Sequence, residues 1–233
     1  MALIAVIGAV PPAIMCSYAL AKWRFPGHSL LNVVVHLPLV LPPVVTGYYL
    51  LLIFGRTSFI GAAIENCCGI RFAFRWTGAA LAAGIMAFPL LVRSIRLSIE
   101  AVDDQLEMAA RGLGATGIDV FLSITLPLSY PGILAGAVLG FAKALGEFGA
   151  TITFVSNIPG ETQTLPSAIY AYIQSPSGEI PALRLAGLAV LVSFGALFIS
   201  ERFVRRGNHR RAIQSHAYAL NTKVLHEQGR LNR

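Results

Sequence analysis

Two short stretches of this chain carry residues whose types and spacing could do chemistry. The run GLGATG at residues 112–117 has the spacing G-x-G-x-x-G, which occurs where a helix N-terminus binds the phosphates of a dinucleotide. Lys143 and Glu147 are ionisable residues four positions apart in an otherwise apolar segment. These residues could form a nucleotide site, a bend between two helices, or a charged position along a membrane pathway.

The dinucleotide interpretation fails on its context, because that fingerprint must follow a buried strand and open a helix. Here the run follows LEMAARGL at residues 106–113, which is rich in good helix formers. The sequence contains no G-x-x-x-x-G-K-[ST] loop and no G-x-S-x-G turn, and its three cysteines match no zinc or redox pattern. We therefore predict a non-catalytic chain with no cofactor and no metal site of its own.

The composition favours lipid over water as the surroundings of most of the chain. Of 233 residues, 55% are hydrophobic and 12% are charged, whereas soluble domains carry about 25% charged residues. The net charge is +7, and eight of the 18 Lys and Arg residues lie within 201–233. Such a cluster is typical of nucleic-acid or membrane-surface binding. Beside long apolar segments, we interpret it as a basic cytoplasmic tail attracted to anionic lipid, with no nucleic acid as partner.

Five apolar segments are long enough, or nearly so, to cross a bilayer as helices. They cover residues 2–21, 30–54, 76–92, about 131–154, and 185–200. We predict an all-α integral membrane protein with about five transmembrane helices, a membrane domain over 1–200 and a tail over 201–233. No basic residue precedes the first segment, as it does in a signal peptide, so we expect a retained span.

The second segment cannot be one straight helix, because Pro38, Pro42 and Pro43 lack the backbone donor that a helix interior needs. We predict a short helix, an irregular break across LPLVLPP at residues 37–43, and a second helix from near Pro43. Two interpretations of the break stay open. It is either a kink in a membrane helix, or irregular backbone that lines a cavity, where it is tolerated.

The loop charges predict the orientation of the chain. Thirteen Lys and Arg residues lie in 22–29, 93–125 and 201–233, and four lie in 55–76 and 155–184. Because basic loops stay in the cytoplasm, we predict an N-terminus outside and a C-terminus inside, which requires an odd number of spans.

The stretch 107–127 predicts a bent pair of helices outside the bilayer. Gly114 is placed to end the first helix in the left-handed conformation, and residues 118–127 follow as a second helix with an apolar face. Such a pair could lie flat on lipid or fill a groove in a partner protein.

This stretch resembles the cytoplasmic loop of ABC-importer permeases, written E-A-A-x3-G-x9-I-x-L-P. The second half of that motif is matched at its spacing by Gly114, Ile124, Leu126 and Pro127, whereas Glu107, followed by Ala109 and Ala110, lies one position early. The resemblance implies coupling helices at about 103–125, within a loop of about 93–127, that insert into a cleft of an ATPase subunit. Gly114 would set their angle, with Leu113, Val120 and Phe121 buried against the partner.

A resemblance to bacterial molybdate permeases covers nearly the whole chain. It rests on HLPLVLPPVVTGYYLL at 36–51 and GEFGATITFVSNIPGETQTLPSAIY at 146–170, of which GEFGA is shared with sulfate permeases. It implies an inner-membrane homodimer, a cytoplasmic ATPase subunit dimer that binds ATP and Mg, and a periplasmic molybdate-binding protein. A tungstate or sulfate permease stays an alternative. An intramembrane enzyme is the alternative from another class, with only Lys143 and Glu147 as ionisable residues at membrane depth.

The fourth segment holds the candidate pathway residues. Ionisable groups at membrane depth usually face the bundle interior or a watery path, so we expect Lys143 and Glu147 to line the translocation pathway or gate, or to form a structural pair. Small or polar residues beside them leave room for a pathway or a helix break: Gly146, Gly149 and Thr151. The stripe Gly132, Gly136 and Gly140 predicts a close helix contact, either within one subunit or between two.

Overall fold

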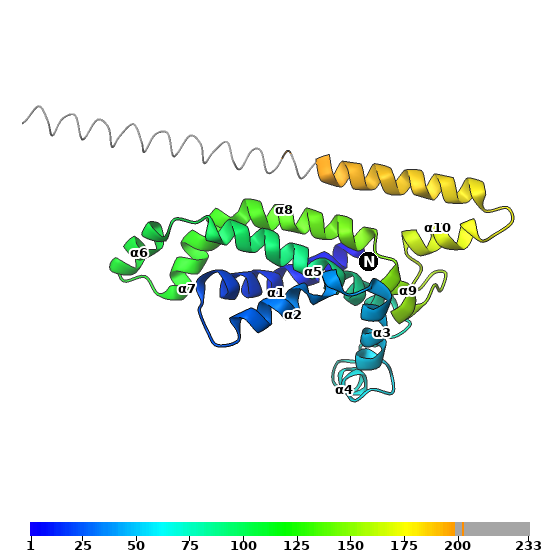
Figure 1. Ribbon diagram of the computed structural model, residues 1–233, viewed down its shortest axis with the longest axis horizontal. Coiled ribbons are helices and arrows are strands. Elements are labelled where there is room, and N and C mark those ends of the chain that lie inside the picture. Colours follow the sequence, from blue (N-terminus) through cyan, green and yellow to red (C-terminus); the bar gives the residue numbers. More distant parts are fainter. Residues whose placement is uncertain (199–201, 203–233) are drawn as a thin grey trace, which may run out of the picture.

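The computed structural model describes residues 1–198 and 202, and this part of the chain is helical without β-strands. Helices α1 (Ala2–Lys22), α5 (Trp76–Glu100) and α8 (Leu126–Leu145) run side by side along the long axis and form the centre of the molecule (Figure 1). A further long helix, Glu179–Phe198, lies along the same axis and is drawn in orange. By length and composition, four helices of this part can span a membrane, or five if a bent pair counts as one span.

That bent pair is the predicted second span. Helix α2 (His28–Val40) and helix α3 (Pro43–Phe54) meet at 116°. The irregular break is shorter than predicted, because it comprises only Leu41 and Pro42, while Pro38 lies inside α2. Pro43 occupies the first turn of α3 and holds Pro42 in an extended conformation, at φ −54° and ψ 133°. The two consecutive prolines therefore set the bend.

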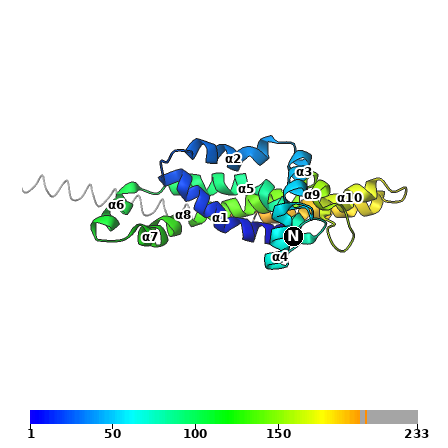
Figure 2. The same cartoon turned by 90° about the horizontal axis from the view of Figure 1, so that it is seen from below.

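The remaining short helices gather at the two ends of the bundle. Helices α4 (Phe59–Cys68), α9 (Gly149–Val155) and α10 (Leu165–Ile173) lie at one end, near the N-terminus. Helices α6 (Asp104–Gly112) and α7 (Gly117–Val120) lie at the other end (Figures 1 and 2). The connection between α5 and α8 is thus on the face of the membrane domain opposite to the N-terminus.

The predicted span 131–154 is wrong at both ends. Helix α8 ends at Leu145, and Gly146, Glu147 and Phe148 separate it from the short helix α9. At its start, α8 is preceded without interruption by α7 and a π-helical turn, Phe121–Thr125, so that one helix of 29 residues runs over Gly117–Leu145. Hydrophobicity alone could not locate these ends, because apolar residues continue on both sides of the break at 146–148.

The glycine stripe of α8 packs against α5 of the same subunit. A Cβ atom at Gly132 would lie 2.2 Å from Ser98 Cβ, and one at Gly140 would lie 3.1 Å from the Leu91 side chain. Because the two backbones are this close, Ser94 Oγ donates a hydrogen bond to the Gly132 carbonyl over 3.0 Å. The stripe therefore holds two spans of one subunit together, as small residues do in membrane helix pairs.

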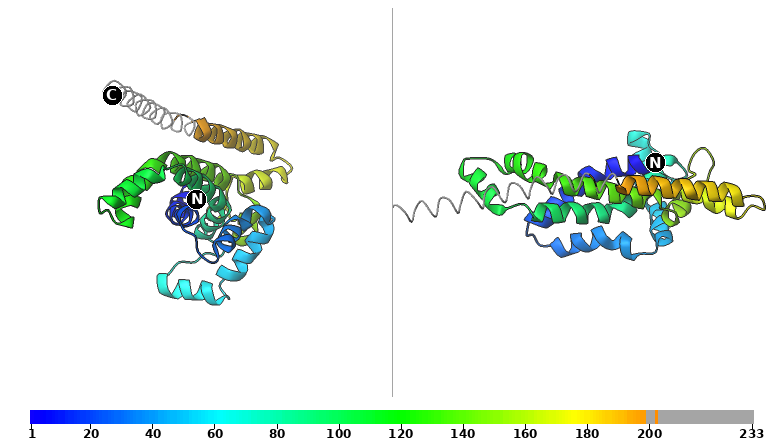
Figure 3. Two further views of the ribbon diagram at one scale, coloured as in Figure 1. Left: turned by 60° about the vertical axis from the view of Figure 1, so that its left-hand side comes forward. Right: turned by 90° about the horizontal axis from the view of Figure 1, so that it is seen from above.

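Helix α1 packs against both α5 and α8. Ser17 is fully buried, and its Oγ donates a hydrogen bond to the Val92 carbonyl over 3.0 Å. Ala13 of α1 lies in one apolar cluster with three residues of α5: Leu91, Val92 and Ile95. The helix Glu179–Phe198 lies on the outside of this three-helix unit, beside α8 in both views of Figure 3, and only 6% of its apolar window is buried. Helices α1, α5 and α8 therefore pack together as one three-helix unit.

Candidate functional site

The bend between α6 and α7 is built by a capped helix end. Gly114 has φ +91°, as predicted for a left-handed residue. The Gly114 N–H donates to the Arg111 carbonyl over 3.0 Å, and the Ala115 N–H donates to the Ala110 carbonyl over 3.1 Å. These are the two bonds of the Schellman motif, which a left-handed residue at this position allows. A residue with a Cβ would be strained at this φ, so glycine fixes the direction of the chain.

A second cap begins α7 two residues later. Thr116 Oγ1 accepts from the Asp119 N–H over 3.3 Å, and Asp119 Oδ2 accepts from the Thr116 N–H over 3.0 Å. This reciprocal capping box satisfies backbone donors that the start of a helix leaves free. The α6–α7 angle is therefore held by hydrogen bonds on both sides of Gly114.

The Ile124, Leu126 and Pro127 positions of the motif lie where a π-helical turn passes into α8. Pro127 has no N–H for the Ser123 carbonyl, and its ring would clash with that carbonyl in a regular helix. The wider turn admits the ring, because the Leu126 N–H bonds to the Phe121 carbonyl five residues back. The sequence motif thus specifies the local geometry that joins the bent pair to the membrane span.

Of the three apolar side chains expected to be buried against a partner, Leu113 is exposed and Val120 is not. Val120 is 1% exposed within this chain, and Phe121 packs against Tyr18 of α1 with ring centroids 4.8 Å apart. The expectation of burial against a partner is therefore wrong for Val120, which is already buried within its own subunit. The exposed apolar side chains of α6–α8 at this end are, with their exposed fractions, Leu113 (90%), Ile118 (72%), Met108 (62%), Leu122 (54%) and Leu106 (49%).

Glu107 also points into the subunit. It is 5% exposed, and its Oε1 accepts a hydrogen bond from Thr125 Oγ1 over 2.7 Å and lies 3.2 Å from Lys22 Nζ. Ala109 is exposed and Ala110 half-buried on the same helix. A cavity of about 450 Å³ opens beside this carboxylate, lined by Tyr18, Lys22, Trp23, Asp104, Glu107, Met108 and Arg111. Sequence spacing gave no sign that Lys22, 85 positions earlier, would contact Glu107.

The second ion pair spans the break between α8 and α9. Lys143 Nζ lies 2.6 Å from Glu147 Oε2, and Glu147 Oε1 accepts from the Ala150 N–H over 3.1 Å. Glu147 is 2% exposed, whereas the Lys143 side chain is 32% exposed. The carboxylate therefore connects the start of α9 to the end of α8.

The small residues around this pair allow close helix contacts. A Cβ at Gly149 would lie 2.8 Å from Pro43 Cβ of α3. Thr151 is buried, and its Oγ1 donates to the Phe148 carbonyl over 2.9 Å. Gly146 ends α8. The break thus lies against the start of α3, next to the bend between α2 and α3.

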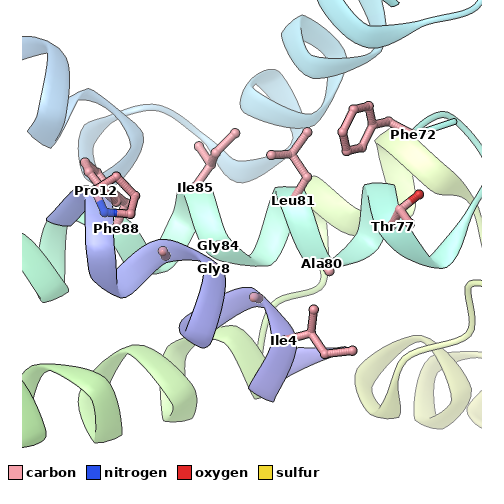
Figure 4. A pocket seen from close by; sticks show the side chains of 12 residues that line it. Ile4, Gly8, Pro12, Phe72, Thr77, Ala80, Leu81, Gly84, Ile85 and Phe88 are labelled. Carbon is pink, nitrogen blue, oxygen red and sulfur yellow. The ribbon is translucent and has the colours of Figure 1, made fainter. Parts of the chain in front are cut away.

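A groove between α1 and α5 is lined almost entirely by apolar residues. It has a volume of about 460 Å³, and Figure 4 shows Ile4, Gly8 and Pro12 of α1 facing Leu81, Ile85 and Phe88 of α5. Thr77 is the one side chain with a hydrogen-bonding group among the residues that line it. A lining of this kind offers almost nothing to an oxyanion, so the groove is no candidate anion site.

Other chemistry-bearing residues form no further site in the part of the chain that the structure describes. Cys16, Cys67 and Cys68 are free thiols, and no group of three His, Cys, Asp or Glu residues there could hold a metal ion. His36 Nδ1 lies 2.8 Å from the Asn32 carbonyl of its own helix. The basic tail lies outside the described residues, except for Arg202.

Comparisons with known proteins agree with this architecture. Residues 9–209 match the family described as the inner membrane component of binding-protein-dependent transport systems. The chain is 55% identical over 207 residues to the molybdenum transport system permease protein ModB of Escherichia coli K12, covering 89% of this chain and 90% of that protein. It is 54% identical over 197 residues to ModB of Haemophilus influenzae, covering 84% and 86%.

A solved structure shows the same fold. A chain of the MetNI methionine ABC transporter, in an inward-facing conformation, superposes with a TM-score of 0.65 at 14% identity, covering 88% of this chain and 92% of that one. With this fold, and with a family match that extends over most of its length, the chain belongs to the family of binding-protein-dependent transport system inner membrane components.

Proposed function

We propose that this chain is the permease subunit of an ABC importer that moves molybdate into the cytoplasm, and that a separate subunit hydrolyses the ATP. The observation that carries the proposal is the bent pair α6–α7, which presents Leu113 and Ile118 to solvent at one end of the bundle. The assignment of molybdate as the substrate rests on the two relatives named as molybdenum permeases, both of which are more than half identical to this chain.

Coupling follows from the geometry of that end. Leu113 and Ile118 have the exposure expected of apolar side chains that fill a groove in a partner. When two ATPase subunits close on ATP, they would push α6 and α7, and the three-helix unit of α1, α5 and α8 would rock with them. ATP and Mg would stay in the ATPase subunits, and this chain would be non-catalytic.

The remaining partners follow from the orientation. We place α6 and α7 in the cytoplasm with the C-terminus, and the N-terminus outside, as the loop charges predict. Helices α4 and α10 would then face a periplasmic molybdate-binding protein. A second copy of the chain would complete the pathway in a homodimer surrounded by lipid.

The Lys143–Glu147 pair belongs to the proposed pathway as the clamp that shapes its break. A Glu147→Gln variant keeps an acceptor for the Ala150 N–H but loses the charge that pairs Lys143. Breaking a buried pair costs about 3–5 kcal/mol, and the cost is lower here because the Lys143 side chain is 32% exposed. We expect uptake to fall at unchanged protein level, measured against an exposed-pair control, Glu65→Gln. Unchanged uptake would remove Glu147 from the mechanism.

Substrate identity is tested by uptake of labelled molybdate in cells that lack their own importer. The chain is expressed with its ATPase and binding protein, and excess sulfate or tungstate is added. We expect molybdate uptake that survives excess sulfate and is reduced by tungstate, which has nearly the same size and charge. Entry of labelled sulfate with no molybdate uptake would support the assignment of the chain as a permease and contradict molybdate as its substrate.

A further inference from the structure

Lys22, Asp104 and Glu107 form a charged cluster where α1 ends beside α6. Lys22 is the last residue of α1, and its side chain is 16% exposed. Its Nζ lies 2.7 Å from Asp104 Oδ1 and 3.2 Å from Glu107 Oε1, both on α6. The Glu107 carboxylate is also hydrogen-bonded by Thr125, which is fully buried at the start of α8. One carboxylate therefore joins three elements that are far apart in the sequence.

We propose that Lys22 and Glu107 form a latch that makes α1 move with the coupling helix α6, and that Glu107 acts inside the subunit rather than on the ATPase. The effect on transport rests on the proposed function, whereas the connection between α1 and α6 rests on the contacts of Lys22 and Glu107 alone. Lys22 and Glu107 are positioning residues, because they touch neither substrate nor nucleotide.

The distribution of exposure supports an internal role. Both Glu107 and Thr125 are buried, so neither side chain has surface left for a second subunit. Asp104 is 79% exposed, and the hydrogen bond and charge of Lys22 hold the pKa of its carboxyl below the usual range. Asp104 is thus the outer, replaceable partner of Lys22, and Glu107 is the inner one.

The ion pair between Lys22 and Glu107 connects α6 to α1, in addition to the turns that join α6 to its neighbours along the chain. Helix α6 is joined to α5 through the turn at residues 101–103, to α7 through the bend at Gly114, and to the start of α8 through the hydrogen bond from Thr125 to Glu107. Without Lys22, these connections would not link a tilt of α6 directly to α1. With it, a push on α6 reaches α1 directly, and α1 is tied to α5 by the bond from Ser17 to the Val92 carbonyl.

Lys22→Met tests the latch in the whole transporter complex in proteoliposomes. It leaves the buried Glu107 charge without its cation, so we expect α6 to loosen and the molybdate taken up per ATP hydrolysed to fall by about fivefold or more, the lower end of coupling between linked sites. Lys22→Arg keeps the charge and should restore most of that ratio. Arg71→Met removes an ion pair at the opposite end of the molecule, with Glu65, and should leave it unchanged.

The double variant Lys22→Met with Glu107→Gln removes both partners and leaves no unpaired buried charge. If they act as one unit, its uptake-to-ATP ratio should be no lower than that of Lys22→Met, since effects within one pair are not additive. If the Lys22→Met protein fails to assemble, the double variant still allows the test, because it has no unpaired buried charge. An unchanged ratio in Lys22→Met, or loss of ATPase-subunit binding in Glu107→Gln but not in Lys22→Met, would overturn the latch.

Amide hydrogen exchange of residues 104–112 in the same complexes separates this proposal from the proposed function. Lys22→Met should speed exchange there by about tenfold or more, because local opening costs less, whichever anion the wild type carries. If exchange is faster in Lys22→Met and the wild type takes up no molybdate, the latch is supported and molybdate as the substrate is contradicted. Wild-type exchange rates in Lys22→Met would overturn the latch even where molybdate is transported.

Discussion

Replacing Gly132 by alanine is expected to destabilise the subunit more than any other single-methyl change along α8. The added Cβ would lie 2.2 Å from Ser98 Cβ and 3.1 Å from the Ser94 carbonyl oxygen, and neither atom is the end of a flexible side chain. Helices α5 and α8 must separate, which strains the hydrogen bond from Ser94 to the Gly132 carbonyl. Overpacking of this kind costs about 1–3 kcal/mol, and we expect a lower melting temperature in detergent.

Two further variants make this expectation specific. Gly195→Ala adds the same methyl group on the outer helix, where nothing lies within 4 Å, and should leave the melting temperature unchanged. Ser98→Gly removes the Cβ that Gly132→Ala would meet, so the two changes together should recover part of the loss. Equal melting temperatures for Gly132→Ala and the wild type would contradict the close packing of α5 on α8.

Replacing Gly114 by valine is expected to uncouple ATP hydrolysis from uptake. Gly114 has φ +91° and open space around it, so backbone strain, not a clash with neighbouring groups, opposes a side chain there. Holding a β-branched residue in this region costs about 1–3 kcal/mol, enough to break the two bonds of the helix end and change the α6–α7 angle. The measurement is the amount of molybdate taken up per ATP hydrolysed by the reconstituted complex.

Gly112→Val is the matched control for this change. Gly112 is the last residue of α6, has no positive φ, and likewise has nothing within 4 Å. Helix propensity favours its valine over glycine by less than about 1 kcal/mol, so the change should leave the ratio near that of the wild type. Normal transport by Gly114→Val would show that the bend tolerates another angle and does not set the coupling.

The bend at Gly114 could be predicted from the sequence because local chemistry determines it. A glycine at the end of a run of helix formers, followed by a threonine and an aspartate three positions apart, encodes both caps without help from the rest of the chain. The break before Pro43 was predictable for the same reason, since proline acts on its own turn. Features of this kind do not depend on which helix lies alongside.

Val120 and Glu107 could not be placed from the sequence because residues far from them in the sequence decide whether they are buried. A helical repeat of 3.6 residues identifies the apolar face of 118–127 but not whether its own subunit or a partner covers it. Here Val120 is buried within its own subunit, and Tyr18 packs against Phe121. Glu107 is likewise in contact with Lys22 and Thr125 of its own subunit. In a chain that is apolar on most faces, hydrophobicity does not identify the outside.

The most direct test of the account is ATP-dependent accumulation of labelled molybdate in proteoliposomes that contain this chain, its ATPase subunit and its binding protein. The account predicts accumulation with ATP and Mg, none when this chain is omitted, and none when a non-hydrolysable nucleotide replaces ATP. Accumulation of molybdate that continues without ATP, or without the ATPase subunit, would contradict the assignment of this chain as the permease of an ATP-driven importer.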